Sequence, residues 1–80
     1  MLVRRALKAF ILVKTRVRAH SDVAARIRKV KGVLHSFPVM GRTDVVAAVE
    51  VNIHELSELA LRIGRIQGVV STETLIGLEK

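Results

Sequence analysis

The chain has 80 residues, of which 50% are hydrophobic and 26% charged, and it contains no Cys, Trp or Tyr. This length allows one small domain, whose core is marginal unless a partner chain helps to bury it. The lack of Cys excludes disulfides and Cys-based zinc sites. Because so many apolar residues coexist with a formal net charge of +7, we expect the chain to self-associate.

The apolar residues are not arranged as a membrane span or a signal peptide. No apolar run reaches the roughly 18 residues that a span requires, because Arg and Lys interrupt each stretch. Met1 to Arg5 contains neither a long apolar segment nor a small-residue cleavage site. We therefore expect a cytoplasmic protein with a single domain over residues 1–80.

Positive charge is concentrated in the first half of the chain. Residues 1–40 contain ten Lys or Arg and one acid, Asp22, whereas residues 41–80 contain four Lys or Arg and six acids. Such asymmetry occurs in proteins that bind nucleic acid or membrane surfaces. A helix whose outer face is solvated by Arg and Lys gives the same pattern, so both interpretations stay open.

The first predicted elements are a strand and a helix. Residues 7–14 form an apolar run that indicates a strand buried on both sides at its centre. Ser21 and Asp22 then provide an N-cap and a first-turn acid for a helix. The buried face of this helix is predicted to consist of Val23, Ala24, Ile27 and Val30. Cations occupy the other face and the last turn, and Gly32 is expected to end the helix.

Two strands joined by a turn are predicted next. Residues 33–40 read as a strand in which Pro38 has no amide to donate, which confines this strand to a sheet edge or a bulge. Residues 41–44 form the turn. Residues 45–51 (VVAAVEV) are the clearest strand of the sequence.

A second helix and a fourth strand complete the chain. Asn52, with Glu55 three residues later, indicates a capped helix start. The apolar stripe of this helix is predicted to be Leu56, Leu59, Ile63 and Ile66. Gly68 is expected to end the helix, and residues 69–78 form the last strand.

The resulting order, βαββαβ, is supported by an internal repeat: VKGVL at residues 30–34 recurs 36 residues later as IQGVV at residues 66–70. This order predicts an α+β, ferredoxin-like fold, with an antiparallel four-stranded sheet of order 4-1-3-2 and both helices on one face. The second strand is then an edge strand, where Pro38 is tolerated. The other face of the sheet is also apolar, so we expect two chains to dimerise sheet to sheet, with further association.

No catalytic or cofactor motif is present. The serines lie outside any G-x-S-x-G context, and the glycines match no phosphate-binding loop. His20, His35 and His54 are too far apart in sequence to form a helical pair of metal ligands. The third strand has no aromatic residue to stack bases, and no helix-turn-helix is formed. We expect no enzymatic activity, no cofactor and no bound metal.

Two polar segments remain, Gly41 to Asp44 and Ser71 to Thr74. The first is explained by a simple hairpin turn, and the second by a strand with alternating faces. The same turn, however, offers free N–H groups and a carboxylate near hydroxyls, which are the groups needed to bind a zwitterion. In that interpretation the N–H and hydroxyl donors bind a carboxylate, and Asp44 binds an ammonium.

From Ala6 to about Leu78 the chain resembles the effector-binding (RAM) domain of Lrp/AsnC transcription regulators, in a stand-alone form. The resemblance rests on the order and spacing of five features: the strand AFILV, the helix ending V-x-G-V, the G-x-x-D hairpin, the helix ending I-x-G-V and the closing T-x-T strand. It implies an αβ-barrel-type dimer that assembles into larger rings. It also implies that amino acids or related effectors bind between dimers and shift the assembly state.

Carried over to this chain, the resemblance implies an effector site at Gly41 and Asp44 of the hairpin and at Thr72 and Thr74 of the last strand. Arg42 and Thr43 are included as members of the same loop, which gives six site residues. Two positions depart from the family pattern, which often has an aromatic where Thr43 stands and a Thr where Met40 stands. Only Met1 to Arg5 precede the first strand, without the N-terminal DNA-binding domain of full-length regulators. Direct DNA binding by this chain alone is therefore not expected.

The leading hypothesis is a regulatory domain that binds a small, amino-acid-like effector at subunit interfaces and modulates transcription regulation through its oligomeric assembly. A full-length regulator of the same family is a potential partner. The first alternative is a structural assembly module without a ligand. The second is a small enzyme of the same dimer architecture, which would have to use His35 with Asp44.

Overall fold

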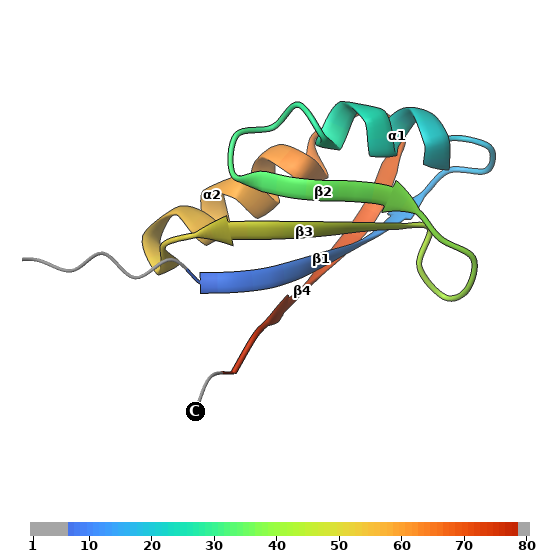
Figure 1. The fold of residues 1–80 in the computed structure, drawn as a ribbon. Coiled ribbons are helices and arrows are strands. Elements are labelled where there is room, and N and C mark those ends of the chain that lie inside the picture. The colour runs from blue at the N-terminus through green and yellow to red at the C-terminus, as the bar shows by residue number, and fades with distance from the viewer. Residues whose placement is uncertain (1–6, 79–80) are drawn as a thin grey trace, which may run out of the picture.

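The computed structural model describes residues 7–78, which form one four-stranded antiparallel sheet with both helices on the same face (Figure 1). The elements in chain order are β1 (Leu7–Thr15), α1 (His20–Ile27), β2 (Val33–Pro38), β3 (Val45–Val51), α2 (Ile53–Gly64) and β4 (Val69–Ile76). The strand order is β2-β3-β1-β4, with β2 and its Pro38 at an edge. The predicted ferredoxin-like topology is confirmed. Neither helix of the described residues 7–78 has the length and apolar character to cross a membrane.

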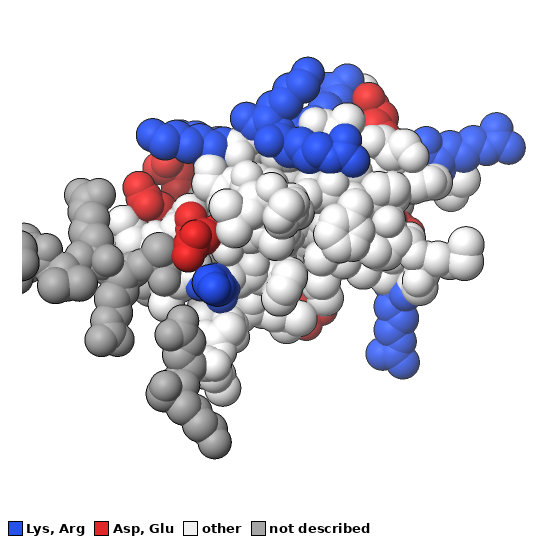
Figure 2. Space-filling view, in the orientation of Figure 1, with Lys and Arg blue, Asp and Glu red and all other residues white. Residues whose placement is uncertain are grey.

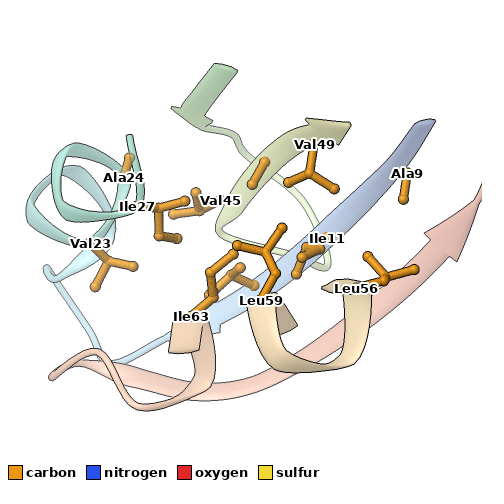
Figure 3. Packing of buried hydrophobic residues seen from close by; sticks show 12 residues of the cluster. Ala9, Ile11, Val23, Ala24, Ile27, Val45, Val49, Leu56, Leu59 and Ile63 are labelled. Atoms are coloured by element: carbon orange, nitrogen blue, oxygen red, sulfur yellow. The ribbon is translucent and has the colours of Figure 1, made fainter. Parts of the chain in front are cut away.

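The core lies between the helices and one face of the sheet. The alternate β1 residues Ala9, Ile11 and Val13 are buried, as are their β3 neighbours Val49, Ala47 and Val45. The helices cover these residues with two apolar stripes, which point toward the sheet in Figure 3: Val23, Ala24 and Ile27 from α1, and Leu56, Leu59 and Ile63 from α2. Alternate residues of the strands and one face of each helix thus form a single core.

The internal repeat is a structural repeat. Gly32 and Gly68 lie at equivalent positions before β2 and β4, with φ angles of +99° and +100°. A side chain at either position would be crowded, because a Cβ on Gly32 would lie 2.7 Å from Val51 Cγ1 and one on Gly68 would lie 3.0 Å from Val23 Cγ2. Glycine is therefore required at both places to turn the chain from a helix into the next strand.

The start and end of α1 differ from the prediction. Ala19, not Ser21, is the N-cap residue, and no side chain caps this helix. The tight turn before it, closed by the Ala19 amide donating to the Arg16 carbonyl oxygen at 3.0 Å, begins the helix at His20. The helix ends at Ile27, because the Lys29 and Val30 amides bond three residues back rather than four. Gly32 thus belongs to a separate turn.

The N-terminus of α2 is as predicted. Asn52 is extended, and its side-chain oxygen accepts a hydrogen bond from the Glu55 amide at 3.0 Å. The helix ends at Gly64, and Gly68 lies in the turn that follows it. Two strands are shorter than predicted: β2 ends at Pro38 rather than residue 40, and β4 ends at Ile76 rather than residue 78.

The face of the sheet opposite the helices is uncovered, and its centre is apolar. We call it the open face and define it by Phe10, Leu12, Phe37, Val46, Ala48 and Leu75, which the strand register places on neighbouring strands. Phe10, Phe37 and Leu75 are 52%, 47% and 45% exposed. Contiguous apolar surface of this kind is typical of an interaction face.

Candidate effector site

The loop between β2 and β3 projects from one end of the sheet (Figure 1). It is closed at its base by the Val39 amide, which donates to the Asp44 carbonyl oxygen at 2.9 Å. The Asp44 amide in turn donates to the Val13 carbonyl oxygen at 2.9 Å and ties the loop to β1. Gly41 lies at the outer part of this loop, where a Cβ would meet no other atom within 4 Å. Space is therefore open beside it.

Asp44 and Thr43 hold the loop against the end of β1. Asp44 Oδ2 accepts a hydrogen bond from the Thr15 amide at 2.8 Å. Thr43 Oγ1 donates to the Val13 carbonyl oxygen at 3.0 Å. These two side chains satisfy main-chain groups at the strand end, which agrees with the structural interpretation of the turn. Asp44 Oδ1 makes no hydrogen bond within residues 7–78 and keeps its acceptor capacity.

A hollow of mixed charge lies between this loop, β1 and β4. It is lined by Leu12, Lys14, Met40, Gly41, Arg42, Thr43, Ser71, Thr72 and Glu73. Lys14 Nζ donates to the Arg42 carbonyl oxygen at 3.0 Å, so the lysine side chain reaches across to the loop. Two cations, Lys14 and Arg42, thus share the hollow with one carboxylate, Glu73. Side chains of opposite charge within one hollow are complementary to a ligand that has both a negatively and a positively charged group.

The loop also offers main-chain donors. Within the described part of the chain, the amides of Gly41, Arg42 and Thr43 have no protein acceptor. Exposed amides of a tight loop can bind a carboxylate through directed hydrogen bonds. The loop thus provides unpaired main-chain donors beside the hollow, whereas the Thr43 hydroxyl, the other predicted donor of the loop, already donates to the Val13 carbonyl oxygen.

The two threonines of the T-x-T segment are placed differently. Thr72 and Thr74 pair with Val13 and Ile11, so they lie on the helix side of the sheet. Both line a largely apolar groove between α2 and β4, together with Ile53, Leu56, Ser57, Ala60, Leu61 and Ile76. Thr72 also lines the hollow at the loop, whereas Thr74 does not.

The six predicted effector-site residues therefore do not form one pocket within a single chain. Gly41, Arg42, Thr43 and Thr72 line the same hollow. Asp44 lies at the base of the loop with its carboxylate on the Thr15 amide, and Thr74 faces the groove beside α2.

Several residues that line the hollow were not among the six predicted site residues, although Ser71 and Glu73 lie in a polar segment that was singled out from the sequence. Lys14, Ser71 and Glu73 enter the hollow because Lys14 pairs with Ser71 and Leu12 pairs with Glu73 across β1 and β4. The alternation along residues 7–14 puts Lys14 on the same face as Leu12, which is a signal the sequence contains. The partner residues on β4 depend on the strand register, which local patterns do not define.

The three histidines are exposed and dispersed over α1, β2 and α2. Among residues 7–78, no group of three or more His, Cys, Asp or Glu side chains is arranged to hold a metal ion.

Comparison with known proteins defines the family. The model of the Lrp/AsnC ligand binding domain matches residues 8–80, so the chain belongs to this family. The resemblance inferred from the sequence is confirmed. The HTH-type transcriptional regulator FL11 of Pyrococcus furiosus is 32% identical over 72 residues, which are 89% of this chain and 48% of FL11. The chain thus spans about half the length of the curated relatives it matches.

Solved structures share the fold over nearly the whole chain. TTHA0845 from Thermus thermophilus has a TM-score of 0.86 and 28% identity, covering 92% of this chain and 95% of its own. The transcriptional regulator NMB0573 of Neisseria meningitidis, solved as an L-Met complex, has a TM-score of 0.79 and 29% identity, covering 92% of this chain and 51% of its own. Similar structures thus include a chain of comparable length and an amino-acid-bound regulator about twice as long.

Proposed function

We propose that the chain is a ligand-sensing regulatory domain: a small amino-acid-like effector binds between packed copies, changes their assembly and thereby modulates transcription regulation. The observation that carries this proposal is the mixed-charge hollow beside Gly41 to Thr43, which adjoins the open face through Leu12. A site at this position is completed by whatever covers that face. Its ligand and its assembly would therefore be coupled.

The groups in the hollow suit an α-amino acid. The loop amides with Lys14 and Arg42 provide donors for a carboxylate, and Glu73 provides an acceptor for an ammonium. The free Oδ1 of Asp44 is a second acceptor at the base of the loop. Leu12 and Met40 supply apolar surface for a side chain. The L-Met complex of the Neisseria relative supports an amino acid as the effector class.

Assembly is proposed to use the open face. Three large side chains there are about half exposed, and packing a second sheet against them removes this apolar area from water. Leu12 and Glu73 pair across β1 and β4 on that same side of the sheet, so a second copy packed on it borders the hollow. Thr74, on the opposite side of β4, contributes to such a site only if a neighbouring copy presents its groove beside α2. This requirement favours an assembly larger than a dimer.

The proposed cellular role is supported by the kind of protein that the relatives are. FL11 is a transcriptional regulator about twice as long as this chain, so co-assembly with a full-length regulator in the cytoplasm is part of the proposal. No enzymatic step and no cofactor is proposed. Residues 1–80 act as a single ligand-binding domain.

A thermal-shift screen against the twenty amino acids tests the proposal. A ligand that binds only the folded state at 100 times its Kd stabilises it by about 2.7 kcal/mol, which raises Tm by on the order of 10 °C for a domain of this size. We expect such a rise with one or a few amino acids. No rise with any of them, for a folded oligomer, would contradict an amino-acid effector and favour the ligand-free assembly module.

Two matched substitutions locate the site. Glu73→Gln removes the acceptor charge in the hollow and should abolish most of the ligand-induced rise, whereas Glu58→Gln on the outer face of α2 should preserve it. Asp44→Asn keeps an oxygen for the Thr15 amide, so the loop should stay in place. The substitution removes the negative charge, so a weaker ligand-induced rise in this variant would reflect the lost charge rather than a displaced loop. If Glu73→Gln binds as well as the wild type, the hollow is not the effector site.

A further inference from the structure

The excess positive charge of the described residues lies in one short segment. Residues 16–31 contain six Lys or Arg and one acid, Asp22, whereas the rest of residues 7–78 contains five Lys or Arg and five acids. Outside this segment the described chain is therefore neutral. Figure 2 shows a cluster of Lys and Arg side chains along the side of the molecule where Figure 1 places α1, with acidic surface at the ends of this cluster.

We propose that α1 and its two flanking turns, residues 16–31, bind the phosphate backbone of double-stranded nucleic acid without reading its sequence. We call this region the α1 surface. All six of its cations are exposed: Arg16, Arg18, Arg26, Arg28, Lys29 and Lys31. Arg26 is paired with Asp22 at 3.1 Å, and no ion pair within residues 7–78 involves the other five.

Individual contacts support a preformed cationic surface. The Arg28 Nε donates to the Ser36 carbonyl oxygen at 2.8 Å, which holds this side chain over β2 without neutralising it. Arg18 has a φ of +68°, in the left-handed region where glycine is favoured, yet the position carries a long cation. Non-glycine residues in such conformations cost free energy and cluster at functional sites.

The surroundings favour a nucleic acid over an acidic protein or a membrane. Val17 is the only large hydrophobic residue of the α1 surface that is exposed. Protein interfaces require an apolar or aromatic centre, and membrane-surface helices carry apolar anchors. Phosphate contacts need neither, because they gain free energy from counterion release. The eight residues of α1 extend about 12 Å, a length over which a duplex presents about seven charges.

The α1 surface shares no residue with the hollow of the proposed effector site. Helix α1 lies on the covered side of the sheet, opposite the open face. Two chains packed through their open faces would therefore present two α1 surfaces on opposite sides. Direct DNA binding by this chain was not expected from the sequence. We depart from that expectation for phosphate contacts only, and not for base recognition.

The test is fluorescence anisotropy of the full chain with two labelled duplexes of unrelated sequence, at salt concentrations from about 25 to about 300 mM. We expect equal affinity for both duplexes, with log K falling against log salt at a slope of about −4. Arg18→Gln with Lys29→Gln should reduce the slope by about 2 and weaken binding about a hundredfold at about 50 mM salt. Circular dichroism would verify that this doubly substituted protein is folded.

A charge-matched control separates the α1 surface from net charge. The double substitution Lys8→Gln with Arg62→Gln also removes two positive charges, but from positions outside residues 16–31. It should weaken binding by no more than about threefold. An equal loss in the control, or no binding at the lowest salt concentration, would overturn the proposal. Equal affinity for polyglutamate of the same charge, or for anionic vesicles, would overturn it as well, because the surface would then bind any polyanion.

Discussion

The two faces of the sheet are built from the same strands and share the same apolar chemistry, but only one is covered by the chain's own helices. In β1, Ile11 is fully buried beneath the helices, whereas its neighbour Phe10 is 52% exposed on the open face. The covered face therefore stabilises the fold of the single chain. The apolar area of the open face contributes to stability only when another chain covers it.

The largest expected effect is on the covered face. Ile11→Ala removes a fully buried side chain from the centre of the core and should lower the free energy of unfolding by about 2–5 kcal/mol. Denaturant titration at two protein concentrations measures it. The decrease in the free energy of unfolding caused by Ile11→Ala should not depend on protein concentration. The decrease caused by Leu12→Ala on the open face should depend on protein concentration, because assembly contributes to stability. The same concentration dependence for both variants would contradict the claim that only the open face is covered by another chain.

The role of the open face in self-association is tested by placing a charge on it. Phe10→Asp should weaken self-association by about 30-fold or more, because it places a charge at the centre of the apolar surface between Ala48 and Leu75. The matched control is Val17→Asp, at a residue that is 91% exposed outside the open face. Size-exclusion chromatography over a dilution series should show a smaller species for Phe10→Asp alone. An unchanged profile would assign assembly to another surface.

The turns that place the helices on the covered face give a smaller effect. Gly32→Ala forces a Cβ to within 2.7 Å of Val51 Cγ1 at a φ of +99° and should lower the free energy of unfolding by about 1–3 kcal/mol. Gly64→Ala, at the end of α2 with open space around it, should raise it by about 0.5–1 kcal/mol. Thermal unfolding measures both, and a stable Gly32→Ala protein would show that this turn adjusts freely.

The smallest expected effect concerns the start of each covering helix. Asn52→Ala removes the side-chain acceptor for the Glu55 amide and should cost about 1 kcal/mol. Ser21→Ala should be nearly neutral, because Ser21 lies inside α1 and caps nothing. Equal destabilisation by the two substitutions in urea titrations would contradict the observed helix start.

The sequence predicted the topology well because its strongest signals are local. The repeat around Gly32 and Gly68, the Asn52 cap and the edge position of Pro38 are each specified by a few neighbouring residues. The start of α1 was predicted incorrectly because Ser21 followed by Asp22 has the composition of a cap. The turn after Arg16, formed by main-chain hydrogen bonds, determines the start instead.

The candidate site was harder to predict because it depends on register and side-chain direction. The loop residues Gly41 to Thr43 could be singled out from the turn chemistry alone. The separation of Thr74 from that loop follows from its pairing with Ile11, and the presence of Glu73 follows from its pairing with Leu12. Neither pairing can be read from a single strand, since a shift of one residue reverses both faces.

The coupling of effector binding to assembly is tested by sedimentation velocity at fixed protein concentration, with and without the amino acid that gives the largest thermal shift. We predict a dimer or larger species without ligand, because a second chain covers the open face, and a changed sedimentation coefficient when the ligand binds at the edge of that face. A monomer without ligand, or an identical distribution under both conditions, would contradict the coupling of effector binding to assembly.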